Sequence, residues 1–261
     1  MVSLLDILTT LDNLVPTHED ELDFRRRMHI GPRSRPDQAK ISVSKVLITP
    51  AIYGRVLTKA TSEFFNLIIS YLPFLERTRN ISGRKWAYVR LLAKNYINVY
   101  ILGHTWLVSD NGANDSLAKA LNLSKGANHK ILQNLGISLF NGTGYVSELI
   151  SVIKEKIGSS YLRVLGDIDN EVETIAIKSG IWDLPQDLEI LREFSIDTMI
   201  VGEIPYSASI ELYNREINVI EIGVVPSLKS GITRLSHALS VEIEDVLFEP
   251  FIVDDPREII I

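Results

Sequence analysis

One short motif occurs twice in this sequence, and it constrains the fold more than any other feature. Ile-Asn-Val-x-x-x-Gly lies at 97–103 and again at 217–223. Each copy closes a run of alternating apolar and amphipathic segments, and each is followed by a helical segment, at 114–121 and at about 227–239. Because the motif holds the same place in two equal element orders, an internal duplication explains it better than chance.

The alternation of segments predicts an α/β fold. Apolar strands are expected at 43–49, 66–70 and 97–102 in the first copy, and at 172–178, 197–201 and 217–223 in the second. Strands that alternate with helices over short connections are typical of a parallel sheet covered by helices. We therefore expect two pseudo-equivalent β-α-β-type halves with mostly parallel sheets, which face a central cleft.

The remaining segments complete the predicted organisation. Ser3 and Asp6 form a capping-box-like start for a helix that extends to Val15. Further helices are expected at 51–65, at 86–96 with Trp86, Val89, Leu92 and Tyr96 on one face, and at 145–157; strands are expected at 131–144 and 161–166. The predicted domains are a first half at 1–125, a connecting segment at 126–170 and a second half at 171–261, and the halves are compatible with one compact unit.

Composition excludes several classes of protein. Cysteine is absent, which excludes disulfides, cysteine zinc sites and thiolate nucleophiles, so any metal would need histidine and carboxylate ligands. No apolar run reaches the ~20 residues of a membrane span. The first 15 residues alternate aspartate with leucine and isoleucine and lack a basic region, so they do not resemble a signal peptide, and a cytoplasmic location is expected. The net charge of −6 argues against nonspecific binding of nucleic acid.

One segment stands out by its charge. Residues 18–36 are polar and contain five arginines, Arg25, Arg26, Arg27, Arg33 and Arg35. A loop with a solvated charged face is the simpler interpretation of such a cluster. The alternative is an anion or phosphate patch, to which Arg77, Arg79, Arg84 and Lys85 would add if the chain closes into a ring.

The candidate functional residues follow the ends of the predicted strands. Open parallel sheets place their ligands at the carboxyl ends of the strands. At these ends lie Tyr71, Leu72, His104, Thr105 and Asp110 in the first half, and Glu203, Glu221 and Val224 in the second. A lone histidine at a strand end is more often a structural hydrogen-bonding residue than a metal ligand, and Gly112–Asp115 is most simply a turn followed by a helix cap.

Familiar catalytic and nucleotide motifs are missing. No Gly-x-Gly-x-x-Gly follows the first strand, and no P-loop is present, so these modes of nucleotide binding have no support. No serine has a nucleophile-elbow motif around it. The chemistry must therefore be sought at the strand ends.

Two stretches of the sequence resemble a known family. GHTWLVSDNGANDSLAKAL (103–121) matches a pattern of the form HTxxD…GGVNDxLAxxLG, and MIVGEI…INVIEIG matches LITGD…DAGH. On these motifs the chain resembles the NIF-three-like dinuclear metal centre proteins, also called GTP cyclohydrolase 1 type 2, from Leu4 to about Phe248. The resemblance implies two similar α/β halves that face a cleft, a dinuclear metal site and assembly as a toroidal hexamer.

The sequence departs from the family pattern at the implied metal ligands. The His-His-Pro motif is Tyr71-Leu72-Pro73 here, and in the His-Thr-x-x-Asp motif His104 and Thr105 remain while Val108 replaces the aspartate. In the last motif, Val224 and Leu228 replace the histidine and the glutamate. Gly202 and Glu203 are kept, but Pro205 and Ser207 replace a lysine and a histidine. Tyrosine, leucine and valine cannot replace imidazole and carboxylate ligands of a divalent cation.

These departures lead to two hypotheses of function. The first is a non-catalytic scaffold or regulatory homo-oligomer that has lost the dinuclear site, needs no cofactor and assembles with itself or with a metal-competent relative. The alternative is a divalent-metal-dependent hydrolase of a nucleotide or phosphorylated metabolite, with a relocated site at His104, Asp110, Glu203 and Glu221. One imidazole and three carboxylates would suit Mg²⁺ or Mn²⁺ better than Zn²⁺.

A third hypothesis is an anion or nucleic-acid binder built on the arginine-rich segment. The affinity of such a binder would fall steeply with salt. The acidic total charge and the lack of aromatic residues between the arginines place it last.

Overall fold

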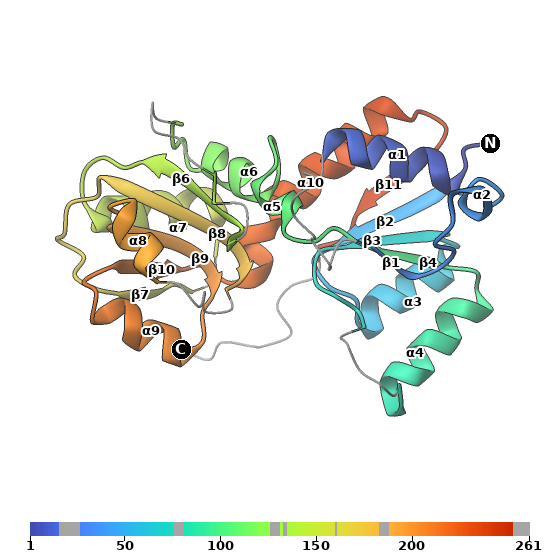
Figure 1. Cartoon of the computed structure of the whole chain (residues 1–261), viewed down its shortest axis with the longest axis horizontal. Coiled ribbons are helices and arrows are strands. Elements are labelled where there is room, and N and C mark those ends of the chain that lie inside the picture. The colour runs from blue at the N-terminus through green and yellow to red at the C-terminus, as the bar shows by residue number, and fades with distance from the viewer. Residues whose placement is uncertain are drawn as a thin grey trace. The chain divides into compact units, whose positions relative to one another are not determined.

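The computed structural model describes residues 1–15, 27–75, 81–125, 131–132, 135–159, 161–182 and 188–252. Their contacts divide the chain into two compact units. The first unit comprises the described residues of Met1–Trp106 and Ile232–Val253, and the second comprises those of Leu107–Gly231. Figure 1 shows a sheet with its helices in each unit. Among these residues, no helix is long and apolar enough to cross a membrane.

The first unit contains a five-stranded sheet of order β1-β4-β3-β2-β11. Its strands are β1 (Arg27–Ile30), β2 (Lys45–Thr49), β3 (Leu67–Ser70), β4 (Asn98–Ile101) and β11 (Leu247–Pro250). The four strands β11, β2, β3 and β4 are parallel, and β1 pairs antiparallel with β4 at the edge. Strands β2 to β4 are almost wholly buried, as expected of apolar strands in a sheet covered on both faces.

The helices of the first unit surround this sheet. They are α1 (Leu4–Leu14), α2 (Arg35–Gln38), α3 (Gly54–Ser62) and α4 (Gly83–Lys94). The predicted capping box is confirmed, because Asp6 N–H donates to Ser3 Oγ while Ser3 N–H donates to the Asp6 carboxylate. Helices α3 and α4 pack their apolar faces on the sheet around Leu57, Leu92 and Ile68.

The second unit contains a six-stranded sheet of order β5-β6-β8-β9-β10-β7. Its strands are β5 (Ile131–Leu132), β6 (Ile137–Asn141), β7 (Arg163–Leu165), β8 (Thr174–Ile181), β9 (Thr198–Glu203) and β10 (Asn218–Glu221). Strands β8, β9 and β10 are parallel, and the other three pairings are antiparallel. The first sheet is thus mostly parallel, as predicted, whereas the second is mixed.

The helices associated with the second sheet are α6 (Ala113–Ala120), α7 (Val146–Ile157), α8 (Glu189–Glu193) and α9 (Tyr206–Tyr213). Alternate residues of its strands enter two separate cores, one with α6 and α7 and one with α8 and α9. Ile200 lies in the first of these cores and its neighbour Met199 in the second. Helix α10 (Val224–Glu242) begins in the second unit and ends in the first.

The structure confirms two pseudo-equivalent α/β halves. The order β2-α3-β3-α4-β4 returns as β8-α8-β9-α9-β10. The motif asparagine plays the same part in both, because the backbone and side-chain N–H groups of Asn98 donate to the Asn66 carbonyl, and those of Asn218 donate to the Asp197 carbonyl. Each half also carries an antiparallel edge strand, β1 or β7, beside the third parallel strand.

The division into units differs from the predicted boundaries at 125 and 170. Strands β6 and β7, which the sequence assigned to a connecting segment, pair with β8 and β10 and belong to the second unit. Strand β11 follows the second half in sequence but pairs with β2 in the first unit. Strand pairing between distant segments therefore decides the units.

Two local predictions also need correction. The sequence predicts loop at 18–36, but β1 and α2 lie in the described part of this segment. Residues 16–26, and with them His18, Arg25 and Arg26, lie outside the described residues, and so do Arg77 and Arg79. Of the predicted apolar face of α4, Leu92 and Val89 pack into the core, whereas Trp86 and Tyr96 are exposed, at 50% and 87%. Tyr96 takes a left-handed conformation (φ 56°) where the helix ends, so Ile97 rather than Tyr96 enters the core.

Candidate functional site

In the first unit, an aromatic cluster occupies the carboxyl ends of β3 and β4. Tyr71 directly follows β3, and its backbone N–H donates to the Thr49 carbonyl. The buried Tyr71 ring meets the ring of His104 edge-on at 6.4 Å between centroids, and it lies 5.7 Å from the Trp106 ring. The structure therefore brings together Tyr71 and His104, two of the residues that the sequence placed at strand ends. The ring that contacts His104 is thus aromatic, at a position where the family pattern has a histidine.

In each unit, most of the other residues at or beside the ligand positions that the resemblance implies are apolar. Leu72 is half-buried, and its N–H donates to the Pro50 carbonyl. The single-turn helix α5 (Thr105–Val108) follows His104, and Thr105 and Trp106 are buried. In the second unit, Val108, Val224 and Leu228 are also buried.

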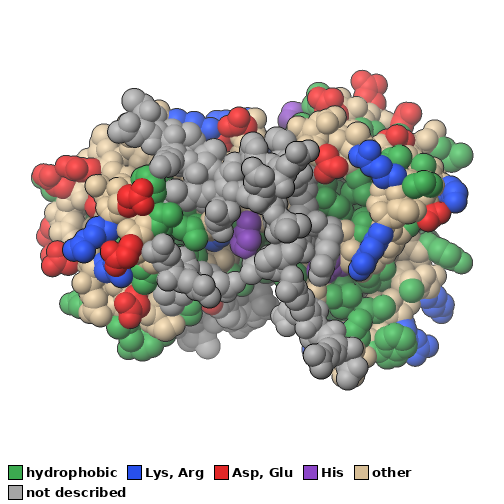
Figure 2. All heavy atoms as spheres, in the orientation of Figure 1, with side chains coloured by type: hydrophobic (Ala, Val, Ile, Leu, Met, Phe, Trp, Pro, Cys, Tyr) green, Lys and Arg blue, Asp and Glu red, His purple; other side chains and the backbone are tan. Residues whose placement is uncertain are grey.

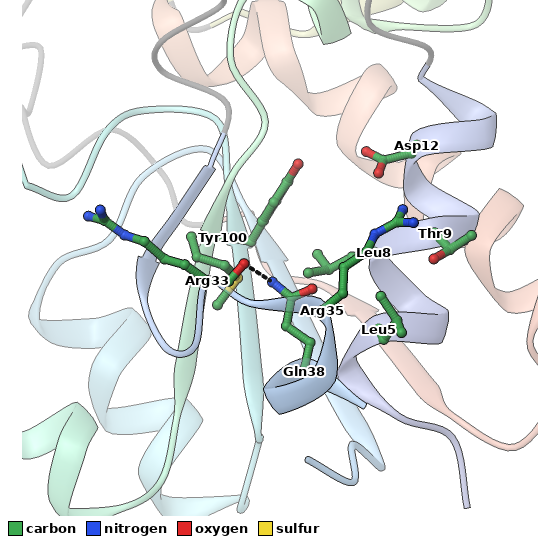
Figure 3. A pocket seen from close by; sticks show the side chains of 9 residues that line it. Leu5, Leu8, Thr9, Asp12, Arg33, Arg35, Gln38 and Tyr100 are labelled. Carbon is green, nitrogen blue, oxygen red and sulfur yellow. Dashed lines mark hydrogen bonds between the residues drawn. The ribbon is translucent and has the colours of Figure 1, made fainter. Parts of the chain in front are cut away.

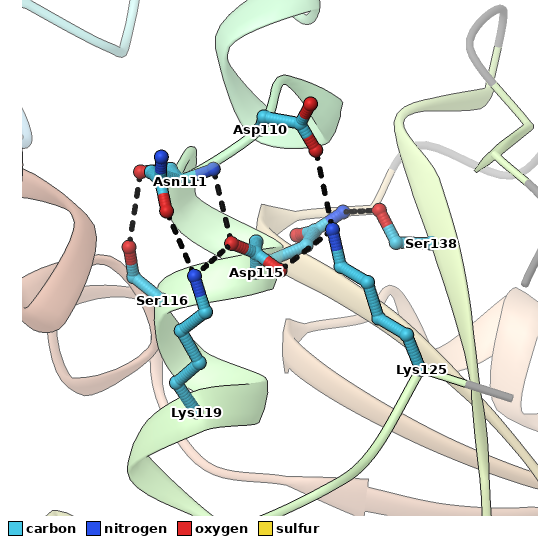
Figure 4. A network of polar contacts seen from close by, with 8 residues as sticks. Asp110, Asn111, Asp115, Ser116, Lys119, Lys125 and Ser138 are labelled. Carbon is cyan, nitrogen blue, oxygen red and sulfur yellow. Dashed lines mark hydrogen bonds and ion pairs between the residues drawn. The ribbon is translucent and has the colours of Figure 1, made fainter.

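Asp110 belongs to a polar network around the start of α6 (Figure 4). Its exposed carboxylate lies 3.2 Å from Lys125 Nζ, which also lies 3.0 Å from the buried carboxylate of Asp115. Lys119 Nζ lies 2.8 Å from the other oxygen of Asp115, and the Asn111 N–H donates to that oxygen. Asp110 is thus neutralised by a lysine.

The sequence suggested that Asn114 caps α6, but the structure contradicts this. The N-cap is Gly112, and Asn114 lies inside the first turn with no exposed surface. Its side-chain amide donates to the Gly136 carbonyl and to Ser138 Oγ, while its Oδ1 accepts from the Ser179 N–H at 3.0 Å. Asn114 therefore ties α6 to β6 and β8, which is a structural role.

Asp115 gives the second unit a measurable dependence on pH. Burial alone would raise the pKa of Asp115, but hydrogen bonds from Lys119, Lys125 and Asn111 together lower it below 3.8. A carboxyl with a lowered folded-state pKa contributes stability above its ordinary pKa and loses that contribution as the pH falls through the folded value. Asp115→Asn is therefore expected to lose about 2 kcal/mol near pH 7, and this loss should shrink steadily as the pH falls below the ordinary pKa of the carboxyl.

Thermal unfolding of both proteins across this pH range checks the prediction. Asp37→Asn is the matched control, because Asp37 also has a lowered pKa, from hydrogen bonds with Ser34 and Lys40, but is exposed. Its effect should be much smaller, because surface pairs are screened by solvent. A gap between wild type and Asp115→Asn that is independent of pH would contradict the role given to this carboxylate.

Charged side chains at the strand ends of the second unit pair with one another. Glu221, at the end of β10, is buried; its carboxylate lies 3.0 Å from the Arg163 guanidinium and accepts from the Ile204 N–H. The pKa of Arg163 is raised, first by Tyr161 and also by Glu221 and Glu203. Glu203, half-buried at the end of β9, thus acts on the same guanidinium. The two predicted acids gather around a cation.

Sequence reasoning missed Arg163 and Lys178. Lys178 lies in the same row of the sheet as Val201 and Glu221, is buried, and donates from Nζ to the Leu135 carbonyl at 2.7 Å. A lysine within the apolar run VETIAIK is a signal that could have drawn attention to it. Arg163 carries no such signal, because only the pairing of β7 with β10 brings it to Glu221.

The structure does not assemble a metal site from the side chains that it describes. Within these residues, no group of three or more histidine, aspartate and glutamate side chains could hold a metal ion. Asp110 pairs with Lys125, and Glu221 pairs with Arg163. The cleft that the sequence predicts between the halves stays a prediction.

Comparisons with known proteins agree with the fold and identify the family. The chain is 26% identical over 238 residues to a GTP cyclohydrolase 1 type 2 homolog of Clostridium perfringens, which covers 85% of each chain. A hypothetical protein of Staphylococcus aureus has the same fold, with a TM-score of 0.80 and 18% identity over 99% of each chain. A Bacillus cereus protein related to NIF3 also has a TM-score of 0.80, with 15% identity over 99% of each chain. The model of the Duf34/NIF3 (NGG1p interacting factor 3) family matches residues 6–255, and the chain belongs to this family.

Proposed function

We propose that this chain is a non-catalytic member of the family, a scaffold or regulatory oligomer without a dinuclear metal site. The observation that carries the proposal is the set of residues at the six family ligand positions. Only His104 is a metal-ligating residue; the others are Tyr71, Leu72, Val108, Val224 and Leu228. Of these five, all but Leu72 are buried.

The residues present do not fit two divalent ions. A dinuclear centre needs several imidazole and carboxylate ligands at one place. His104 has the Tyr71 ring as its neighbour, and the acids nearest in sequence to the family motifs are held by Lys125 and Arg163. Uncompensated charge among buried apolar side chains is strongly unfavourable. A metal pair at these positions therefore has no physical support.

The metal content of the purified protein tests this proposal. The chain is purified without chelator, incubated with Mn²⁺, Zn²⁺ or Mg²⁺, desalted and measured by elemental analysis. We expect near-zero occupancy with each ion. About two ions per chain, as in a two-metal site, would overturn the proposal. A metal-binding relative treated in parallel is the positive control.

The scaffold role predicts assembly with the chain itself or with a metal-competent relative. The family resemblance suggests a hexamer, which the mass in solution by light scattering would test. A nucleic-acid partner is not favoured, because the described side chains on the face shown in Figure 2 intersperse acidic and basic groups over both units, and no single basic patch dominates among them. A purely monomeric chain that also fails to bind a co-expressed relative would contradict the scaffold role.

A second candidate is a metal-dependent hydrolase of a nucleotide. Two clostridial relatives bear the name GTP cyclohydrolase 1 type 2 homolog, and they are 26% and 27% identical to this chain. His104 is the residue on which such an activity would depend. Release of product from GTP in the presence of Mn²⁺ or Mg²⁺, abolished by His104→Ala, would favour this candidate over the scaffold. Equal product release by His104→Ala would exclude a site built on this histidine.

A further inference from the structure

The first unit has a pocket of about 380 Å³ between α1, the segment 33–38 and the sheet (Figure 3). It lies within the size range of small-molecule sites. None of the predicted strand-end residues lines it. The pocket is therefore separate from the family's metal-ligand positions, and its capacity to bind a ligand does not depend on the proposed function.

The floor of this pocket is apolar and rigidly held. Leu5 and Leu8 come from α1, whose start is fixed by the Ser3–Asp6 capping box. Met28 comes from β1, and the ring of Tyr100 comes from β4. Leu8, Met28 and Tyr100 are buried, so their positions are set by the packing of the sheet and the helix. A ligand on this floor must offer an apolar surface.

Arg35 supplies a positive charge at one end of the pocket. Figure 3 shows its guanidinium on the α1 side, near Thr9 and Asp12, whereas the side chain of Arg33 extends away from them. The buried amide of Gln38 donates to the Pro32 carbonyl at 3.1 Å, which fixes the turn before Arg35. The arginine-rich segment thus contributes the guanidinium of Arg35, at a defined position, to a small apolar pocket.

We propose that this pocket binds a small monocarboxylate with an apolar tail. Arg35 pairs with the carboxylate, for which the planar guanidinium is well suited, and the tail lies on Leu8, Met28 and Tyr100. The single guanidinium that Figure 3 shows on the α1 side balances one negative charge, which a carboxylate supplies. The combination of this cation with an apolar floor selects a singly charged, mostly apolar ligand.

Hexanoate is the probe for the first test, with binding measured by ligand-observed NMR on the full chain. Hexanoate should bind at least about tenfold more tightly than acetate, because each buried methylene adds to the affinity. It should also bind more tightly than hexylamine and 1-hexanol, which share the tail but not the carboxylate. Equal binding of hexylamine or 1-hexanol, or no binding of hexanoate to the folded protein, would overturn the proposal.

Two variants test the assignment of Arg35. Arg35→Met should weaken hexanoate binding at least about tenfold, because a charge-assisted hydrogen bond is lost. Arg84→Met, at an exposed arginine of α4 outside the pocket, should leave it unchanged. The thermal midpoint of each variant confirms folding. Equal losses in Arg35→Met and Arg84→Met would overturn the proposal.

Discussion

Replacing Asn114 with alanine is expected to lower the free energy of unfolding by about 4 kcal/mol. The side chain is fully buried and makes three hydrogen bonds, to the Gly136 carbonyl, Ser138 Oγ and the Ser179 N–H. Alanine leaves these groups without the amide, and each unsatisfied buried group costs about 1–3 kcal/mol. Gly136 lies just before β6, Ser138 lies in β6 and Ser179 lies in β8. The substitution should therefore destabilise the second unit as a whole.

Urea denaturation of the variant and the wild type measures this loss. Asn95→Ala is the matched control, because Asn95 is exposed and its amide donates to a single carbonyl, that of Leu91. The control should lose no more than about 1 kcal/mol. If both variants lost the same amount, the three buried bonds would not contribute as proposed.

The sequence was sufficient to predict the strands of both repeats. The runs LIIS, NVYI and NVIE are apolar because each strand is buried on both faces of a helix-covered sheet, and burial leaves a continuous signal. The strands missed or misassigned are of another kind. β1 lies at the edge of its sheet, and β11 reaches its partner only after the whole second half of the chain. Such pairings leave no local pattern.

The ends of five helices were harder to predict, because no glycine closes them as Gly158 closes α7. Five turns after helices place a non-glycine residue in the left-handed conformation: Phe64, Tyr96, Asn122, Ser195 and Glu216. In each case the next residue is apolar, and its N–H donates back to a carbonyl five residues earlier, as in Phe65 to Ala60. The apolar residue that enters the core determines these turns, so a search for glycine misses them.

The candidate site shows the same limit. Tyr71 and His104 follow adjacent parallel strands, and in the structure their rings meet. The prediction of a helix cap at Asn114 was wrong, because its three hydrogen-bond partners lie 22 or more residues away in the sequence. The pairing of Glu221 with Arg163 likewise depends on β7, whose place at the sheet edge is not visible in the sequence. Topology thus predicts positions, while long-range partners decide the role of each side chain.

Gly202→Ala is expected to destabilise the protein by about 3 kcal/mol. Gly202 lies in β9, and a Cβ at this position would meet the carbonyl oxygen of Gly180 and lie 2.7 Å from Ser227 Oγ. Gly180 belongs to a bulge of β8, and its N–H donates to Ser227 Oγ, which donates in turn to the Val224 carbonyl. A methyl group would therefore push β8 away from β9 and break the tie to α10.

Chemical denaturation compares Gly202→Ala with Gly54→Ala. Gly54 opens α3, and a Cβ there would meet only Tyr88 Oη, at an ordinary contact distance of 3.5 Å. Alanine favours a helix over glycine, so the control should be unchanged or more stable by a few tenths of a kcal/mol, up to about 1 kcal/mol. The direction of the two effects is thus opposite for the same chemical change. If Gly202→Ala were as stable as Gly54→Ala, the bulge of β8 would accommodate the methyl group without loss of stability. The close packing of Gly180, Gly202 and Ser227 would then not be what holds the carboxyl ends of β8 and β9 to α10.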